Sequence, residues 1–420
     1  MTPEFLFHQL LNLGTEWRVS RCEFDAPSGE VNLWIEETPA LWTGECARRK
    51  EPVRCYDHVE ELEWRHLNIF EHRCTLRCRL PRGRRGDGTT YRVTPPWEGL
   101  AKHFTKAFEA MALLLMRHMS MSAVARAIKE TDTRLWRVMH AHVAEARQQL
   151  DWSGVTCVGC DELSIRKGHN YVTVFADMKA RHVLFATPGK DMTTWDRFMK
   201  ELDKHNGHGK AINEVSMDMS LAYQAGARAY LRDDATIVFD PFHVMKQVGE
   251  GVDSVRRLES SQGTPAVVEL LKDSRWVLLK NKANLTVNQA LQLPELEKSN
   301  LHCAKAYQMR LALQDIYRLP TRDEAKTRLT AWIAWVRVHA LTAETVFGKM
   351  VKCAAMIESH LTGILQHWVS RTTNAYLEGL NSVFSAVKRR ARGFRSDENL
   401  IAMLYFTSGN LKIPHTVTTH

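Results

Sequence analysis

The chain has 420 residues, a formal net charge of +9 and a hydrophobic content of 44%. These values fit an ordinary soluble protein of about two to four domains that can bury several cores. They also favour a polyanionic partner, such as nucleic acid or an anionic membrane face. A membrane-spanning segment is excluded, because the longest uninterrupted apolar run, Ala110–Met116, is far short of the roughly 20 residues that a span needs.

The N-terminus lacks both the basic region and the long apolar region of a secretory signal. Nine cysteines without an export signal indicate free thiols or metal ligands in a reducing cytosol, rather than a disulfide framework. We therefore expect a cytoplasmic protein without a membrane partner.

Residues 1–98 are predicted to form a small Cys/His-rich module that binds DNA. Strands are predicted around Val31–Ile35 and at Cys74–Leu80. Small modules of this composition are often built around zinc. The candidate ligands form no compact pair of ligand pairs, so buried cysteines remain the alternative to a bound zinc. These candidates are Cys22, Cys46, Cys55, His58, His66, His72, Cys74 and Cys78.

Residues 99–150 are predicted to form a helix-turn-helix domain. A helix is expected over 104–119, a short one over 122–128, and a third for which Thr131-Asp132-Thr133 offers the cap. This order is typical of a helix-turn-helix, although a plain three-helix bundle gives the same pattern. The third helix would carry Arg134, Arg137 and His140 outward, where they suit phosphates or base edges.

Residues 151–247 alternate between predicted strands and helices. The expected strands are Val155–Cys160, Tyr171–Ala176, His182–Ala186, Ile212–Met217 and Thr236–Phe239. Strand-strand-strand-helix-strand-helix-strand is the order of a ribonuclease-H-like core. In that topology the first and fourth strands are neighbours, so Asp161 and Asp218 would meet at the ends of buried strands.

Residues 248–370 are predicted to be an all-helical insertion, and residues 371–420 to return to the core with a final helix. On that helix the apolar residues form one stripe, and Glu378 lies on the opposite face as its only acid. Its later turns are basic, and we expect them to contact DNA phosphates. The basic residues concerned are Lys388, Arg389, Arg390 and Arg392.

Two carboxylates on neighbouring strands and a third on a helix suit phosphodiester chemistry. Asp161, Asp218 and Glu378 could hold two Mg²⁺ or Mn²⁺ ions, with Asp161 bridging both. The alternative interpretation is ordinary: an Asp at a strand end is often a turn residue, and a Glu on a helix face is often solvated. Asp240 also follows a strand, and His243 could support the site, contact DNA, or simply begin a helix.

Several blocks of sequence surround these carboxylates. They are Gly159-Cys-Asp-Glu162 with Arg166–Val174 and Asp177, Val215–Ser220 with Tyr223, Phe239–Val244, and Asn374–Ser382 through Arg392-Gly-Phe394. In combination these blocks resemble the ISL-three family of bacterial insertion-sequence transposases, and the similarity extends over about residues 40 to 410. The resemblance implies a DDE transposase with Asp161, Asp218 and Glu378 as its triad.

The N-terminal module departs from the family pattern. The family carries zinc-binding Cys-x-x-Cys pairs, whereas Cys46-Ala-Arg-Arg49 has arginine in the second place and Arg84–Gly88 occupies the region of the later pair. The module could fold without zinc or with fewer ligands. Two other segments of this chain, Trp64–Leu67 and Pro95–Trp97, do resemble the family's module.

The function expected from these features is that of a DNA transposase in the bacterial cytoplasm, at the nucleoid. It would bind terminal inverted repeats, cleave DNA and transfer the 3′-hydroxyl ends to target DNA, with two copies of the chain joining in a synaptic dimer. Two alternatives stay open: a catalytically silent DNA-binding derivative, and a ribonuclease-H-like nuclease that does not join strands.

Overall fold

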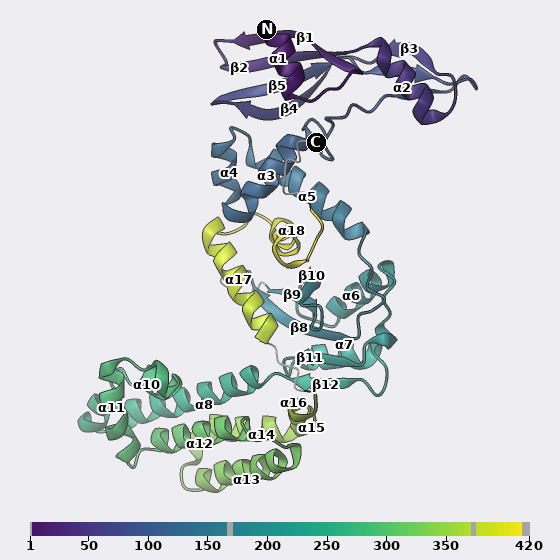
Figure 1. The fold of residues 1–420 in the computed structure, drawn as a ribbon. Coiled ribbons are helices and arrows are strands. Elements are labelled where there is room, and N and C mark those ends of the chain that lie inside the picture. The colour runs from purple at the N-terminus through teal and green to yellow at the C-terminus, as the bar shows by residue number, and fades with distance from the viewer. Residues whose placement is uncertain (1, 166–170, 371–374, 414–420) are drawn as a thin grey trace. The chain divides into compact units, whose positions relative to one another are not determined.

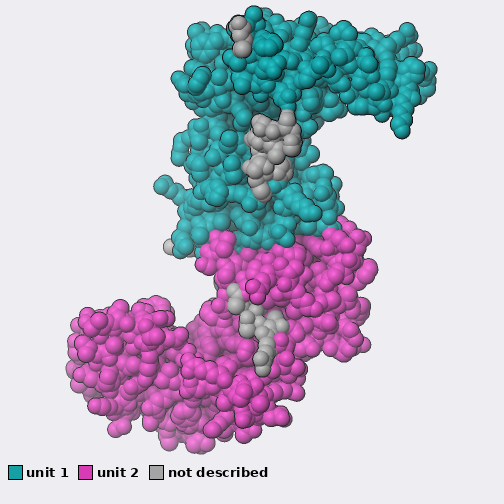
Figure 2. Space-filling view, viewed as in Figure 1, with its two compact units in different colours: residues 1–150, 384–420 teal, residues 151–383 magenta. Residues whose placement is uncertain are grey.

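The computed structural model describes residues 2–165, 171–370 and 375–413. The chain is mixed α/β and divides into two compact units, residues 1–150 with 384–420 and residues 151–383 (Figure 2). Within the described ranges, no helix is both long and apolar enough to cross a membrane.

The N-terminal module consists of two β-sheets with short helices (Figure 1). Its elements are α1 (Pro3–Leu10), β1 (Trp17–Asp25), β2 (Glu30–Glu37), α2 (Pro39–Arg49), β3 (Arg54–His58), β4 (Leu62–Ile69), β5 (His72–Cys78), β6 (Pro81–Arg84) and β7 (Thr90–Arg92). One sheet has the order β1-β2-β5-β4, and the other β3-β6-β7. The strand predicted around Val31–Ile35 is confirmed, and the one at Cys74–Leu80 begins two residues earlier and ends at Cys78.

The core of this module is built from aromatic rings and aliphatic side chains of the four-stranded sheet. Trp97 makes edge-to-face contacts with Trp17 at 5.0 Å and with Trp64 at 5.9 Å between ring centroids. Cys74 and Cys78 are fully buried in the same core, and burial raises the pKa of each thiol to about 12. Both cysteines therefore pack in the core, and among the described residues neither belongs to a group of three side chains close enough to hold a metal.

The helix-turn-helix is formed by α3 (Lys106–His118), α4 (Met121–Ala127) and α5 (Asp132–Gln148). Each helix begins after a residue whose hydroxyl oxygen accepts a hydrogen bond from a backbone amide of the first turn. These capping residues are Thr105, Ser120 and Thr131 respectively. Such a cap is worth about 1 kcal/mol. The predicted start of the third helix at Thr131-Asp132-Thr133 is confirmed, and the capping residue is Thr131.

The chain's last helix, α18 (Asp397–Ser408), packs against α5 within the same unit. His140 on α5 hydrogen-bonds to Asn399 at 2.8 Å between Nε2 and Oδ1. Arg147 lies over the Tyr405 ring at 3.8 Å, and Trp136 contacts the ring of Phe394. The helix-turn-helix is thus completed by a segment that follows it by more than 200 residues.

The second unit contains a five-stranded sheet of order β10-β9-β8-β11-β12 (Figure 1). Its strands are β8 (Cys157–Ser164), β9 (Tyr171–Asp177), β10 (His182–Pro188), β11 (Glu214–Met217) and β12 (Thr236–Phe239). The first three form an antiparallel meander, and β8, β11 and β12 run parallel as neighbours. The expected meander and the pairing of the first and fourth strands are confirmed.

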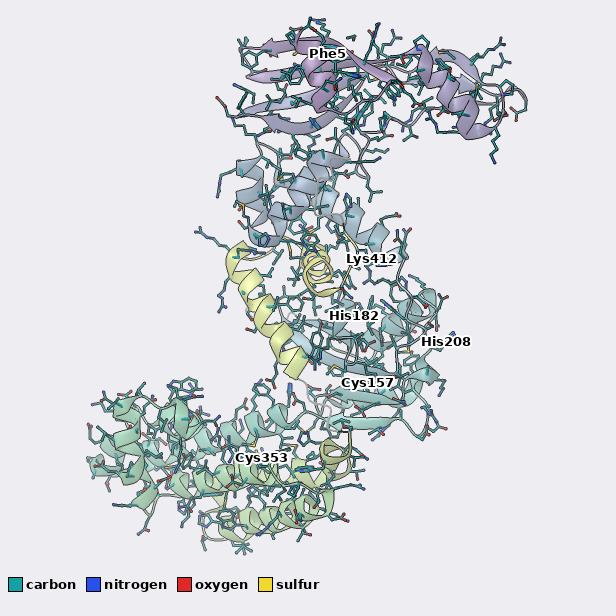
Figure 3. All side chains as sticks on the ribbon, viewed as in Figure 1. Phe5, Cys157, His182, His208, Cys353 and Lys412 are labelled. Carbon is teal, nitrogen blue, oxygen red and sulfur yellow. The ribbon has the colours of Figure 1, made fainter. Side chains whose placement is uncertain are left out.

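The first strand differs from its predicted range. It begins at Cys157 and continues to Ser164, because its antiparallel pairing with β9 runs from Val158 to Ser164. Asp161 therefore lies within the strand and not at its tip. Cys157 (Figure 3) and Cys160 are buried free thiols, in keeping with their interpretation as packing residues.

Helices α6 (Thr193–Lys204) and α7 (Leu221–Tyr230) accompany this sheet. Phe198 of α6 stacks on Phe175 of β9 with ring centroids 4.2 Å apart, and Trp195 meets the same ring edge-on. These rings bury one face of the sheet, as their helical spacing predicts.

The stretch after β12 is helical, as expected. It comprises α8 (Pro241–Gln262), α9 (Pro265–Leu271), α10 (Arg275–Leu279), a short 3₁₀ turn at Lys282–Asn284, α11 (Val287–Lys298), α12 (His302–Ile316), α13 (Arg322–Ala340), α14 (Glu344–Ser359), α15 (Leu361–Leu365) and α16 (His367–Ser370). Another 3₁₀ turn, Gly209–Ala211, lies earlier, before β11. The long helices α8, α12 and α14 pack against one another, and α13 packs on α12 and α14. Helix α17 (Ala375–Ala391) follows; its residues to 383 belong to the second unit and those from 384 to the first.

Candidate active site

Three aspartates lie side by side on the neighbouring parallel strands of the second unit, Asp161 within β8 and Asp218 and Asp240 directly after β11 and β12. Ser216 of β11 pairs with Gly159 of β8, so two residues further along the chain Asp218 comes beside Asp161. Met217 pairs with Phe239, so Asp218 also has Asp240 as its neighbour on the other side. Neighbouring strands lie about 4.8 Å apart, and residues in register point to the same face. The sheet therefore gathers three carboxylates in a line.

Asp161 is the central, largely buried member of this site, with 12% of its side chain exposed. Its Oδ2 accepts a hydrogen bond from Asn381 Nδ2 at 2.7 Å, and its Oδ1 accepts one from the Glu162 amide at 2.7 Å. Burial raises the pKa of Asp161, and the charge of Asp218 raises it further, against the lowering effect of these hydrogen bonds. The carboxylate is therefore held in place but lacks a full counter-charge.

Asp240 is 4% exposed and caps α8, because its Oδ1 accepts a hydrogen bond from the Phe242 amide at 3.0 Å. Its buried Oδ2 has no hydrogen-bond partner among the residues that the structure describes. Burial raises the pKa of Asp240 to about 6, and the charges of Glu378 and Asp161 contribute to the rise. A buried carboxylate oxygen without a partner is costly unless a cation meets it.

His243 lies between two of these carboxylates. Its Nε2 lies 3.9 Å from Asp161 Oδ1 and 3.8 Å from Asp240 Oδ2, one turn into α8. The structure thus brings both predicted supporting residues, Asp240 and His243, to the predicted catalytic carboxylate. Both separations exceed hydrogen-bonding distance, so His243 leaves Asp240 Oδ2 without a hydrogen bond.

Glu378 lies exposed in the first turn of α17. The preceding residue, Leu377, is buried against Gly159 of β8: a Cβ added at Gly159 would lie 2.8 Å from Leu377 Cδ1. The absence of a side chain at Gly159 therefore allows the helix to approach the strand that carries Asp161. Asn381 follows Glu378 by three positions and so lies on the same helical face.

These groups suit a hard divalent cation. Carboxylate oxygens are the ligands that Mg²⁺ and Mn²⁺ prefer, and the unpartnered oxygen of Asp240 is consistent with a missing positive charge. The oxygens of Asp161, Asp218 and Glu378 do not all lie within 4.8 Å of one another; among the described residues only Glu37, Cys55 and His58 meet that spacing.

The sequence analysis named three further residues of this site within its motifs but assigned them no role. Asn381 contacts Asp161 directly, and its helical spacing from Glu378 was the signal that could have identified it. Burial raises the pKa of Glu162, and the charge of Asp218 adds to the rise. Tyr223 Oη lies 2.8 Å from Thr173 Oγ1 behind this edge of the sheet. Asn374 and residues 166–170, which belong to the family-like blocks, lie outside the described residues.

The residues expected to bind DNA fall in the first unit. Arg137 is exposed on α5, whereas Arg134 is half-buried, pairs with Glu130 at 2.8 Å and lies over the Phe104 ring. Arg389, Arg390 and Arg392 are exposed and Lys388 is half-buried, and all four belong to the unit that holds the helix-turn-helix. Arg390 is tied to that domain, because its Nη1 donates to the Arg117 carbonyl at 3.0 Å.

Known proteins similar to this chain agree with these features. A family model for a DDE transposase of the ISL3 group matches residues 158–404, and one for the helix-turn-helix domain of transposase family ISL3 matches residues 102–143. The chain is 30% identical over 391 residues to the transposase for insertion sequence element IS1001 of Bordetella parapertussis, covering 90% of this chain and 92% of that protein. It is 26% identical over 437 residues to the transposase for insertion sequence element IS1557 of Mycobacterium tuberculosis, covering 96% and 95%.

Proposed function

The chain belongs to the ISL3 family of insertion-sequence transposases, and from this premise we propose that it cleaves DNA at the ends of such an element and joins the freed 3′-hydroxyls to target DNA. The observation that carries the proposal is the row of Asp161, Asp218 and Asp240 beside the first turn of α17, which bears Glu378. The sheet order β10-β9-β8-β11-β12 supports a ribonuclease-H-like core.

Asp161, Asp218 and Glu378 are the proposed catalytic triad and the proposed ligands of two Mg²⁺ or Mn²⁺ ions. When bound, such ions would activate the attacking water or 3′-hydroxyl and stabilise the leaving oxygen of the phosphodiester. Asp161 is the proposed bridging ligand, because it is central to the row and its Oδ2 is oriented by Asn381.

Asp240 and His243 are proposed to support the triad. The hydrogen bond to the Phe242 amide fixes the Asp240 carboxylate at the start of α8. His243, on the same helix, lies between Asp161 and Asp240, with its Nε2 3.9 Å and 3.8 Å from an oxygen of each. Together they hold the carboxylates near one another on β8, β11 and β12 when DNA is absent.

DNA binding is proposed to rest on the first unit. Arg137 lies on the exposed face of α5, while the opposite faces of α5 pack on the domain core and on α18. Arg395 extends this basic surface to the first turn of α5, where it pairs with Asp132 at 3.3 Å. Arg134 and the basic residues 388–392 complete the proposed phosphate-binding set. Binding of this kind weakens steeply with salt.

The proposed division of labour follows the chain. Residues 1–98 and 99–150 bind the terminal inverted repeats, residues 151–247 and 371–420 carry the catalytic groups, and residues 248–370 form the helical insertion. Two element ends have to be held together during transfer, so we propose a homodimer in the synaptic complex, acting at the bacterial nucleoid.

The test is an assay on supercoiled plasmid carrying the element's ends, with Mg²⁺ or Mn²⁺. Joined products would support the transposase activity. Nicks without joining would instead identify a nuclease of ribonuclease-H-like type, and a gel shift without cleavage would identify a catalytically silent DNA-binding derivative.

A further inference from the structure

We propose that Glu37, Cys55 and His58 bind a zinc ion that links the two sheets of the N-terminal module. One donor atom of each residue lies within 4.8 Å of the others, and among the described residues this is the only group of three such side chains. The site involves none of the carboxylates assigned to catalysis, so it stands independently of the proposed function.

A β-bulge places Cys55 and His58 together. In a regular strand, residues three apart face opposite sides of the sheet. Strand β3 pairs with β6 through Cys55 with Gly83, Asp57 with Arg82 and His58 with Pro81, and the register shifts between Cys55 and Asp57. The bulge adds one residue to β3 between Cys55 and His58, and this shifts the alternation so that both side chains face the same side of the sheet.

Glu37 approaches from the other sheet. It is the last residue of β2, which belongs to the four-stranded sheet, whereas Cys55 and His58 belong to the three-stranded one. Glu37 Oε1 lies 2.7 Å from His58 Nε2, so the two side chains already meet without a metal. An ion bound by all three would cross-link the sheets at a point where their hydrogen bonding does not continue.

The donors fit zinc better than a harder cation. Zinc binds cysteine sulfur, histidine nitrogen and glutamate oxygen, and three protein ligands leave one position for water. The Glu37 carboxylate brings a negative charge within 4.8 Å of the Cys55 sulfur. A cation bound between them would be attracted by that charge, and binding would release the thiol proton.

The neighbouring candidates are engaged elsewhere. Cys46 Sγ accepts a hydrogen bond from the Val53 amide at 3.3 Å, and Asp57 forms a bidentate pair with Arg82. Arg49, which stands where the resemblance leads one to expect a cysteine, bonds to Glu45 and lies over the Tyr91 ring at 3.5 Å. The bulged strand therefore supplies ligands that the altered Cys-x-x-Arg segment does not.

Cobalt provides the most specific test, because a thiolate bound to Co²⁺ gives a charge-transfer band that carboxylates cannot give. The full chain with Asp161→Asn, which weakens competition from the catalytic carboxylates, is stripped with a chelator and titrated first with Co²⁺ and then with Zn²⁺. We expect the band at one ion per chain and its loss when zinc displaces cobalt. Zinc should also protect one thiol from a disulfide reagent.

Matched variants separate this site from other thiols. Cys55→Ser should abolish the band, and His58→Gln should lower metal affinity by about ten- to a hundredfold, the loss typical of a disrupted zinc environment. Cys22→Ser and His72→Gln in the same module should leave both properties unchanged. A band that survives Cys55→Ser, or no band in a chain whose circular dichroism is native, would overturn the proposal.

Discussion

Gly159 sets how closely the helix bearing Glu378 can approach the strand bearing Asp161, so Gly159→Ala should impair catalysis without touching a catalytic group. The new methyl carbon would lie 2.8 Å from Leu377 Cδ1 and would also clash with Met178. Carbon atoms in contact are at least about 3.5 Å apart, so α17 would have to move by about 0.7 Å unless Leu377 changes rotamer.

The Gly159→Ala substitution should lower both the stability of the fold and the rate of cleavage. Overpacking of this kind costs about 1–3 kcal/mol of the free energy of unfolding. Misplacement of a reacting group by about 1 Å can lower the rate by about a hundredfold, so the shift at Glu378 should reduce the rate of end cleavage by about ten- to a hundredfold. Affinity for the element's ends should fall much less than the rate, because Arg134, Arg137 and the N-terminal module, which are proposed to bind them, lie outside α17.

The assay is single-turnover cleavage of end-containing DNA, with binding and thermal unfolding measured on the same preparation. Gly379→Ala is the matched control, since a Cβ there meets nothing within 4 Å and alanine favours a helix by about 1 kcal/mol over glycine. A folded Gly159→Ala chain that cleaves at the wild-type rate would refute this account of how α17 is positioned.

Further predictions concern single contacts. Asn381→Ala removes the hydrogen bond to Asp161, and such a bond to a charged acceptor contributes about 1.5–3 kcal/mol. Its loss should lower the cleavage rate roughly ten- to a hundredfold and raise the Mg²⁺ concentration needed for half-maximal rate. An unchanged metal titration would contradict this role. Burial, together with Arg65, lowers the pKa of His66 from 6.5 to about 4, so the folded state binds this proton less readily than the unfolded state. The free energy of unfolding should therefore fall as the pH drops from 6.5 to about 4, by at most about 3 kcal/mol. In thermal unfolding, His66→Gln should show a shallower pH dependence over that interval. Arg137→Ala and Arg389→Ala should each lower the slope of log affinity against log salt by about 0.9, as measured by fluorescence anisotropy; parallel salt lines would exclude these residues as phosphate contacts.

The helices and strands that could be predicted from the sequence are those marked by a pattern among neighbouring residues. Short apolar runs bounded by turn signals identified the strands of the five-stranded sheet, and Thr131-Asp132-Thr133 identified the start of α5, because both signals depend on neighbouring residues. The order of those strands was enough to expect Asp161 beside Asp218, and the observed register agrees with that expectation.

Features that depend on distant or irregular contacts were not predictable. The packing of α18 on α5 joins residues such as Asn399 and His140, which no local pattern relates. Its apolar residues surround the helix, so periodicity does not show which face is covered. The bulge that brings Cys55 and His58 together leaves no trace in the spacing, and the contact of Asn381 with Asp161 depends on how closely α17 approaches β8.

The most direct test of the central claim is strand transfer by Asp161→Asn, Asp218→Asn and Glu378→Gln, each compared with Asp240→Asn. Pre-cleaved element ends, target DNA and Mg²⁺ are supplied, and binding of the ends is measured on the same preparations. We predict that each of the first three substitutions abolishes transfer with end binding nearly intact, and that Asp240→Asn retains reduced transfer. Transfer by any of the first three, or complete loss in Asp240→Asn with activity kept in Asp218→Asn, would contradict the assignment of the triad.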